Sequence, residues 1–289
     1  MFQPDRSQYP ARRADGTCEI DLASGKHLKL WQGPNHPGIT GNMSVELTVC
    51  GDEVVEGRTH VGYLHCGFEK LMERRTFIRC FPIVCRICVP EPDFNEYLYA
   101  AAVEELSGIK APESARWIRT MILEMGRLNS YMMYLGGQAG SLGLGVIGQW
   151  TTYARDSMLD RFEELTGARI YHMFILPGGV RDGRPEGFKA RLQGTLREVE
   201  QVMRDVAEVM FQNAVFKRRT VGVGVIAPEM IEPCGVTGPN ARACGVAKDL
   251  RKDQPGVLRD LFHALALEET KHKNELEATY YKVVHSGGV

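Results

Sequence analysis

The stretch ARWIRTMILEMGRLNSYMMYLGG, residues 115–137, decides the fold of this chain, because its apolar residues repeat with the period of an α-helix. They recur at helical spacings and are Ile118, Met121, Ile122, Met125, Leu128 and Met132. Pro112 precedes the stretch, at a position where the first turn of a helix tolerates a missing N–H group. An apolar face of this width must be covered by neighbouring elements, so the stretch predicts a helix inside a helical bundle.

The segments on either side of this stretch predict further helices and a small sheet. We expect helices at 93–107, 149–166, 186–216 and 257–284, the first closed by Gly108 and the second ending before Gly167. We expect strands at 43–49, in a hairpin partner at 53–64, in RIYHMFI at 169–175 and in TVGVGVIAP at 220–228. The fold class is therefore α+β, a small N-terminal β domain on a mainly helical bundle. Its predicted parts are an arm (1–28), a β-rich domain (29–90) and a helical core with short strands and a polar C-terminal helix (91–289).

The composition is typical of a folded protein in a reducing compartment. The 289 residues are 44% hydrophobic and carry a formal net charge of −1, which argues against a nucleic-acid-binding protein. The 8 cysteines are too few for a disulfide scaffold, and the first residues lack the apolar run of a signal peptide. Residues 128–154 carry no charge but contain six glycines, so we expect a helix end, a glycine-rich loop and a new helix there, not a membrane span.

Three cysteines fall within ten residues in RCFPIVCRIC, residues 79–88. The C-x4-C-x2-C spacing is that of a plant-type [2Fe–2S] site, which needs a fourth, distant cysteine. Cys85 and Cys88 also have the spacing of a zinc-ligand pair. The intervening residues are bulky, however, and buried free cysteines often behave as small hydrophobic residues. Metal binding, redox chemistry and simple packing all stay open from the spacing alone.

Two other residues are candidates for chemistry. His36 lies between two prolines in GPNHPG, residues 33–38, a rigid turn that either aims the side chain into a cleft or leaves it in solvent. Glu124 lies within the apolar stripe, with Arg119 and Arg127 in helical reach, where it either forms a helix-packing salt bridge or relays protons. The sequence has no phosphate loop G-x-x-x-x-G-K-[ST] and no dinucleotide fingerprint G-x-G-x-x-G, so we expect no ATP or NAD site in this chain.

The chain resembles the D subunit of respiratory complex I, which is related to the large subunit of membrane-bound nickel–iron hydrogenases. The segments that carry the resemblance are GPNHPGITGNMSVELTVCGDEVVEGRTHVGYLHCGFEKLMERRT, NEYLYAAAVEELSGI, ARWIRTMILEMGRLNSYMMYLGG, LTGARIYHMFILPGGV and GPNARACGVAKDLRKDQP. Together they cover about residues 31–255. The resemblance implies a hydrogenase-large-subunit-like fold and a peripheral position at the cytoplasmic face of the cell membrane, with no transmembrane segment.

The resemblance also implies partners and cofactors. A small partner subunit would carry a [4Fe–4S] cluster beside this chain, and membrane-arm subunits and other peripheral-arm subunits would complete the assembly. A cleft between the two neighbouring subunits would host a quinone or another acceptor. NAD, if used, would bind elsewhere in the complex. This chain itself is expected to bind neither a cofactor nor nucleic acid.

The resemblance assigns the cleft residues one by one. In complex I the segment that matches Cys85–Cys88 reads D-R-L-D, and Arg86 matches the arginine of the family. The tyrosine that follows in complex I, a hydrogen-bond donor to the quinone, corresponds to Val89. The first cysteine pair of the hydrogenases, C-x-x-C, would fall on Cys88 and Glu91.

The remaining quinone contacts of the family are replaced as well. The second histidine after the G-P-x-H-P turn corresponds to Thr40, and the aspartate that pairs with it corresponds to about Ser141. A carbonyl acceptor loses roughly 1–3 kcal/mol for each unmatched hydrogen-bond partner. The second cysteine pair of the hydrogenases has no counterpart in this sequence, so the resemblance does not carry over a four-thiolate nickel–iron site.

We therefore expect an electron-transfer subunit of a membrane-bound, energy-converting oxidoreductase. It would pass electrons from a neighbouring [4Fe–4S] cluster to a quinone-like or other acceptor and couple this transfer to ion translocation. The alternatives are a degenerate scaffold subunit and a hydrogenase-related large subunit without a full nickel–iron site. The predicted catalytic residues are Cys85, Cys88 and Glu91, of which the two cysteines are the candidate metal ligands. The predicted acceptor cleft is lined by His36, Thr40, Arg86, Val89 and Ser141.

Overall fold

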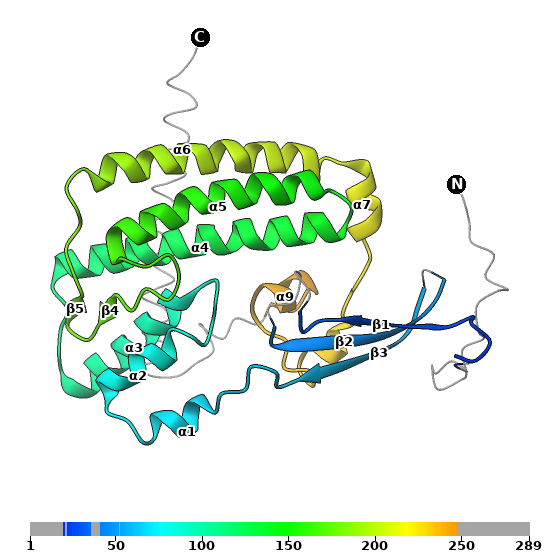
Figure 1. Cartoon of the computed structure of the whole chain (residues 1–289), viewed down its shortest axis with the longest axis horizontal. Coiled ribbons are helices and arrows are strands. Elements are labelled where there is room, and N and C mark those ends of the chain that lie inside the picture. The colour runs from blue at the N-terminus through cyan, green and yellow to red at the C-terminus, as the bar shows by residue number, and fades with distance from the viewer. Residues whose placement is uncertain (1–19, 21, 36–40, 52, 248–289) are drawn as a thin grey trace, which may run out of the picture. The chain divides into compact units, whose positions relative to one another are not determined.

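The computed structural model describes residues 20, 22–35, 41–51 and 53–247 (Figure 1). The chain divides into two compact units, residues 1–217 and 218–289. The predicted helix at 257–284, together with His36 and Thr40, lies outside the described residues. The predicted division into three parts stays a prediction.

The first unit begins with a three-stranded antiparallel sheet of order β1-β2-β3, formed by β1 (Leu28–Gln32), β2 (Met43–Cys50) and β3 (Glu53–Val61). Opposite charges support its register, since Glu46 accepts hydrogen bonds from Lys29 on β1 and from His60 on β3. The predicted strand at 43–49 and its hairpin partner are confirmed.

Three long helices follow the sheet in sequence and form a layer: α4 (Glu113–Ser141), α5 (Gly145–Thr166) and α6 (Phe188–Val206). Figure 1 shows α5 lying between α4 and α6. The helix predicted from residues 115–137 is confirmed as the central part of α4. The last turn after α6 is a π-helical segment, η2 (Ala207–Phe211), which continues the predicted amphipathic helix.

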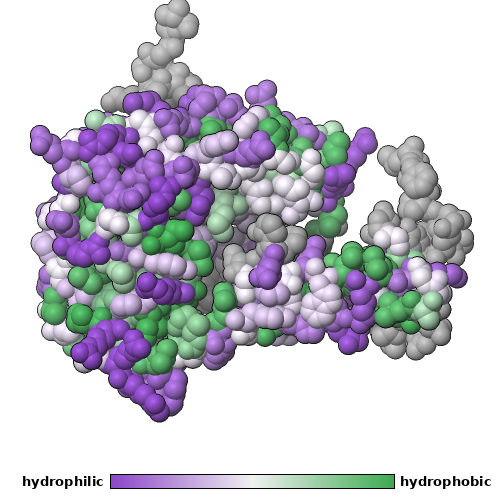
Figure 2. Space-filling model, viewed as in Figure 1, coloured by the Kyte–Doolittle hydropathy of each residue, from purple (hydrophilic) through white to green (hydrophobic). Residues whose placement is uncertain are grey.

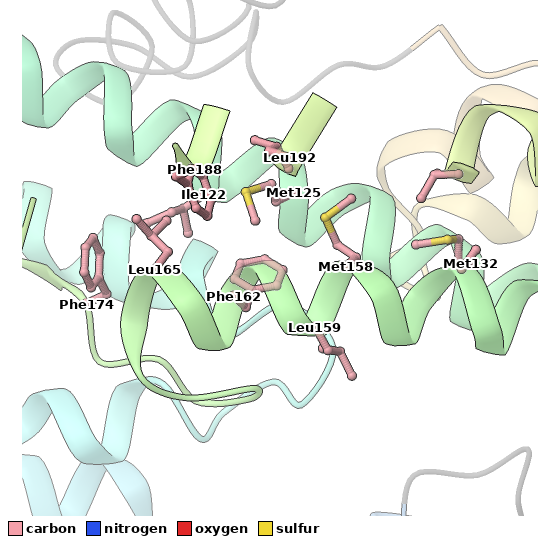
Figure 3. Packing of buried hydrophobic residues seen from close by; sticks show 12 residues of the cluster. Ile122, Met125, Met132, Met158, Leu159, Phe162, Leu165, Phe174, Phe188 and Leu192 are labelled. Carbon is pink, nitrogen blue, oxygen red and sulfur yellow. The ribbon is translucent and has the colours of Figure 1, made fainter. Parts of the chain in front are cut away.

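The apolar stripe of α4 packs into the main hydrophobic core of this unit. Figure 3 shows the side chains of α4, α5 and α6 meeting between the helices. The buried members of this core are Ile122, Met125, Met132, Ala154, Met158, Leu159, Phe162, Leu165, Phe174, Phe188, Leu192 and Val199. Their burial removes a large apolar surface from water, at about 25 cal/mol per Å², and fixes the packing of the layer.

The glycine-rich region between α4 and α5 is more helical than predicted. The connection shrinks to residues 142–144, and α5 begins at Gly145, earlier than residue 149. A methyl group added at Gly136 would lie 2.4 Å from the Thr151 hydroxyl and 3.4 Å from the Gly148 backbone. The glycines therefore serve close helix–helix packing, which an interpretation of glycine as a helix breaker misses.

Two short helices and a third, longer one stand before α4, namely α1 (Phe68–Met72), α2 (Phe77–Val84) and α3 (Pro92–Ser107). Gly108 closes α3 in the left-handed conformation, as predicted. After α5 the chain forms a minimal hairpin of β4 (Ile175–Leu176) and β5 (Gly179–Val180). The predicted strand at 169–175 is therefore wrong except at its last residue, because backbone groups of 173–175 bond to a side chain of α3.

The predicted strand at 220–228 is also wrong. Residues up to 220 belong to α7 (Ala214–Thr220), and the second unit contains α8 (Pro228–Ile231) and α9 (Gly238–Ala243). Gly222 and Gly224 have φ values of 75° and 70°, in the left-handed region, which interrupts an extended chain.

No helix in the described part of the chain is both long and apolar enough to cross a membrane. Figure 2 shows hydrophobic patches between hydrophilic side chains on one face of the molecule. Many large hydrophobic side chains are exposed, among them Phe77, Ile78 and Leu98.

Candidate functional site

Cys85 and Arg86 stand at the end of α2, where the helix leaves backbone carbonyls unsatisfied. The guanidinium of Arg86 donates from Nη1 to the Pro82 carbonyl over 2.7 Å and to the Cys85 Sγ over 3.2 Å. One cationic side chain thus caps the helix and contacts the buried thiol next to it.

The two cysteines of this turn differ in their surroundings. Cys85 is fully buried, and burial, with a smaller contribution from the charge of Glu96, raises the pKa of its thiol to about 11 in spite of Arg86. At neutral pH Cys85 is therefore a protonated thiol and a poor nucleophile. Cys88 is half-buried and is the more accessible of the two.

Glu96 of α3 fixes the loop that follows α5. Its two carboxylate oxygens accept the backbone N–H groups of Met173, Phe174 and Ile175 over 2.6, 2.9 and 3.2 Å. Burial and the nearby charge of Asp93 raise the pKa of Glu96, while the three N–H groups oppose this rise. The carboxylate replaces the strand partners that these N–H groups lack.

The 171–173 segment, Tyr171-His172-Met173, has an unusual backbone. Tyr171 and Met173 have φ values of 59° and 46°, in the left-handed region that side chains other than glycine rarely adopt. Arg86 lies with its guanidinium carbon 5.2 Å from the centre of the Tyr171 ring and with Nη1 3.8 Å from the Met173 Sδ. Strained positions of this kind persist where surrounding contacts hold them, and they concentrate at functional sites.

His172 bonds to Asp93 at the start of α3. Its Nδ1 lies 2.8 Å from Asp93 Oδ1, its Nε2 lies 3.2 Å from the Arg169 carbonyl, and its ring stacks on Phe162 at 4.2 Å between centroids. Burial alone would lower the pKa of His172, but the hydrogen bond to Asp93 and its charge outweigh burial and raise it. The segment thus links two parts of the site: Tyr171 and Met173 contact Arg86, and His172 bonds to Asp93.

A small pocket of about 10 Å³ adjoins this pair, room for about one water molecule. It is lined by Val89, Pro90, Pro92, Asp93, Gly126, Asn129, Phe162, Arg169, Ile170 and His172. Two buried oxygens of lining residues, Asp93 Oδ2 and Asn129 Oδ1, have no hydrogen-bond partner among the described residues. Such orphaned acceptors are rare in folded proteins and call for a ligand or a water molecule.

The comparisons with known proteins give the family. Residues 142–262 match the family described as respiratory-chain NADH dehydrogenase, 49 Kd subunit. Over 233 residues the chain is 44% identical to the D subunit of the NADH-quinone oxidoreductase of Thermosipho melanesiensis, a match that covers 81% of this chain and 64% of that protein. The chain belongs to the family of complex I D subunits.

Other members of this family and its structural relatives serve different respiratory enzymes. The chain is 36% identical to the D subunit of the F(420)H(2) dehydrogenase of Methanosarcina mazei, covering 83% of this chain and 65% of that protein. A solved structure of the membrane-bound sulfane sulfur reductase, an archaeal respiratory membrane complex, matches with a TM-score of 0.72 and 40% identity. That match covers 81% of this chain and 63% of the other. The matches thus span less than two thirds of the length of each of these relatives.

The structure brings some residues predicted from the complex I resemblance together and leaves others apart. Cys85 and Arg86 are in contact, and Val89 lines the pocket. Cys88 and Glu91 are half-buried in the same connection between α2 and α3. Ser141, by contrast, is exposed at the end of α4, where its hydroxyl donates to the Gly137 carbonyl. It lies twelve residues beyond Asn129, or roughly 18 Å along the helix axis.

The iron–sulfur and zinc hypotheses for the cysteines at 79–88 need a set of ligands around one point, and the part of the chain that the structure describes shows none. No group of three or more His, Cys, Asp or Glu side chains there is arranged to hold a metal ion. The seven described cysteines are all free. Glu124, 46% exposed in its side chain, pairs with Arg127 over 3.3 Å, so the salt-bridge interpretation holds for it.

Sequence reasoning missed Asp93, Glu96 and His172, which hold the site together. A signal was available, since Asp93 and Glu96 lie three residues apart on α3 and so share one helix face. His172, the partner of Asp93, is 79 residues away in sequence, and its segment, which also supplies the N–H groups bound by Glu96, has the composition of a strand. Only the three-dimensional structure pairs them.

Proposed function

We propose that this chain is the acceptor-reducing subunit of a membrane-bound respiratory oxidoreductase, with its acceptor site at residues 85–91. The observation that carries the proposal is the contact of Arg86 with the buried Cys85 thiol, beside the strained 171–173 segment. Membership of the complex I family supports the setting at a membrane-bound complex. Electrons reach the site from a [4Fe–4S] cluster of a partner subunit, and the transfer is coupled to ion translocation.

The chemistry of this segment favours an anionic sulfur compound over a quinone as the acceptor. Val89 offers no hydrogen-bond donor to a quinone carbonyl, whereas the exposed guanidinium of Arg86 attracts an anion, and Cys88 is accessible to it. Reductive cleavage of a sulfur–sulfur bond takes two electrons and two protons and gives two thiols. The sulfane sulfur reductase among the similar structures supports this acceptor class.

The experiment is acceptor-dependent turnover of the purified complex that carries Cys88→Ser or Cys85→Ser. We expect Cys88→Ser to lower polysulfide reduction at least tenfold, and Cys66→Ser, at an exposed cysteine outside the segment, to leave it unchanged. Metal analysis of the same samples tests whether the cysteine pair holds an ion. Unchanged turnover in both variants would contradict the proposal and favour a scaffold subunit.

Thiol accessibility supplies a second test. At pH 8 an iodoacetamide label should enter Cys88 well before Cys85, because the protonated Cys85 offers roughly one thiolate per thousand molecules. Mass spectrometry of the labelled peptide separates the two positions. Equal labelling of both cysteines in the folded protein would overturn this picture of the turn.

A further inference from the structure

Asp93 and His172 form a buried acid–base pair that the acceptor chemistry at residues 85–91 leaves unused. Their side chains are 0% and 3% exposed, and the pair lies against the pocket lined by Val89 and Pro90. Reductive chemistry at that segment consumes protons, so the pair is in the right place to supply them.

The hydrogen bonds fix where the proton of the pair resides. The Arg169 carbonyl can only accept, so Nε2 of His172 carries a hydrogen and Nδ1 faces Asp93. A bare Nδ1 and a carboxylate oxygen at 2.8 Å would place two lone pairs against each other. In the resting state one proton therefore lies between them, either on the imidazole or on the carboxyl group, and its loss leaves an unfavourable contact that favours reprotonation.

The second oxygen of Asp93 gives this proton a way out. Asp93 Oδ2 has no partner among the described residues and points toward α4, where a methyl group added at Gly126 would lie 3.5 Å from it. Gly126 lines the same pocket, as does Asn129 with its own unpartnered oxygen. The pocket has room for about one water molecule, which would supply the hydrogen-bond donor that Asp93 Oδ2 lacks.

We propose that Asp93 and His172 form a proton relay that delivers protons from the pocket side of the Asp93 carboxyl group to a water molecule in the pocket beside Val89 and Pro90. The Nδ1 proton of the imidazolium moves to Asp93 Oδ1. The carboxyl group then turns about its Cβ–Cγ bond, which brings Oδ1 to the pocket side and Oδ2 to the His172 side, and the proton leaves Oδ1 for the water molecule. The imidazole is then neutral and the carboxylate is restored. The imidazole takes up its next proton from bulk solvent, by way of water that exchanges with the pocket. This inference rests on the proposed function, since it names the proton source of that site.

The charges around His172 are compatible with such a relay. On α3, Glu96 adds negative charge next to Asp93, and on the loop after α5, Arg169 lines the pocket and Arg181 donates to the His172 carbonyl. From the helices α5 and α4, the uncharged Phe162 stacks on the His172 ring and Asn129 lines the pocket. Three carboxylates of α5, those of Asp156, Asp160 and Glu163, pair with Arg169. The carboxylates of Asp93 and Glu96 favour the protonated imidazole, so the resting pair is protonated and releases its proton when the acceptor is reduced.

The protonation of the pair is measurable without any turnover. In the full chain with ¹⁵N-labelled histidine, NMR should show His172 releasing its proton at a higher pH than a free histidine, near 6.5. Asp93→Asn should lower the proton affinity of His172 at least tenfold, and Glu124→Gln, at an exposed ion pair, should leave it unchanged. Titration of His172 at the ordinary value, unaltered in Asp93→Asn, would overturn the relay.

Transfer through the pocket is tested by filling it. Gly126→Ala places a methyl group in ordinary contact distance of Asp93 Oδ2 and suits a helix interior, whereas Gly194→Ala on α6 meets open space. In the purified complex we expect Gly126→Ala to slow acceptor reduction at least tenfold and to enlarge its solvent deuterium isotope effect. Gly194→Ala should change neither quantity. Equal rates in the two alanine variants would overturn transfer through this pocket.

The two proposals fail in different ways. If Cys88→Ser abolishes turnover while Gly126→Ala and Asp93→Asn do not affect it, the acceptor site stands and the relay is wrong. If no variant of residues 85–91 affects turnover, the proposed function is wrong, and the NMR titration still reports whether the pair holds its proton. Circular dichroism and thermal melting of each variant separate lost transfer from lost folding.

Discussion

Helix α3 holds the loop between α5 and α6 at two places, and the two places differ in how completely their polar groups are satisfied. Near the end of α3, Glu104 binds the Gly178 N–H over 2.8 Å and pairs with Arg119 of α4 over 2.6 Å. Near its start, Asp93 and Glu96 bind the loop at residues 172–175. Both places use carboxylates of the same helix, fully buried at Asp93 and Glu96 and 13% exposed at Glu104.

The Glu104–Arg119 network is closed. The Arg119 guanidinium also donates to the carbonyls of Leu176 and Gly179 over 2.8 and 2.9 Å, and no polar atom of either side chain is among the unpartnered buried atoms of the described residues. The turn between β4 and β5 that it holds needs glycine only at Gly178, with φ of 84°. Such a network holds the β4–β5 turn in place, and none of its polar atoms is left to bind a ligand.

The Asp93–Glu96–His172 network is open. It leaves Asp93 Oδ2 without a partner among the described residues and holds Tyr171 and Met173 in the left-handed region. The two networks teach that buried charge alone does not mark a functional site. An unfilled acceptor and a strained backbone beside a pocket do, because folding alone gives no reason to keep them.

The largest effect is expected in the closed network. Arg119→Met should lower the free energy of unfolding by about 3–5 kcal/mol, because it removes the guanidinium from the largely enclosed Glu104 carboxylate and from the carbonyls of Leu176 and Gly179. Urea denaturation measures this loss. Adding Glu104→Gln should recover part of it, since the uncompensated charge is removed. A loss below about 1 kcal/mol would mean that this network is not the structural one.

The open network should make the free energy of unfolding depend on pH. The folded-state pKa of His172 is raised above its unfolded value near 6.5, so the stability from its protonated form is complete below pH 6.5. That contribution is lost as the pH rises through the folded pKa, at about 1.4 kcal/mol per unit of pKa difference. Unfolding free energies of the wild type and His172→Gln should therefore converge as the pH rises above 6.5. Parallel curves would contradict a raised pKa in the folded state.

Much of the fold could be predicted from the sequence, because it depends on local periodicity. The apolar stripe of residues 115–137, the closure of α3 at Gly108 and the hairpin of β2 and β3 all follow from patterns within one segment. The errors arose where tertiary contacts override local preference. The segment at 169–175 has a strand-like composition, but Glu96 binds its backbone N–H groups in place of a strand partner. Gly136 and Gly148 lie inside helices because the two helices pack closely there.

The candidate site could be predicted only in part. Cys85, Arg86 and Val89 were found because they are consecutive or nearly so in sequence and match one family motif. The Asp93–His172 pair could not be found in this way, because neither residue carries a motif and 79 positions separate them. Burial and an unfilled oxygen, on which the proposed relay depends, are properties of the folded chain alone.

The strain of the open network should appear in a matched pair of variants at Met173. Met173→Gly and Met173→Ala both remove the contact with Arg86, but only alanine must keep a Cβ atom at φ of 46°. The left-handed conformation costs about 1–2 kcal/mol for a residue with a Cβ atom, and glycine loses roughly 0.5–1 kcal/mol of backbone entropy. Thermal or urea unfolding should therefore show the glycine variant to be more stable by about 0.5–1 kcal/mol. Greater stability of the alanine variant would mean that the segment is not strained.

The smallest effect is expected where a charged pair belongs to neither network. Glu124 and Arg127 lie three residues apart on α4 and are 46% and 29% exposed, so solvent screens their interaction. Glu124→Gln should change the free energy of unfolding by less than about 0.5 kcal/mol and should leave acceptor turnover unchanged. Urea denaturation and turnover of the same preparation check both quantities. A tenfold loss of turnover would make Glu124 a second proton carrier and would remove the contrast between buried open networks and exposed ion pairs.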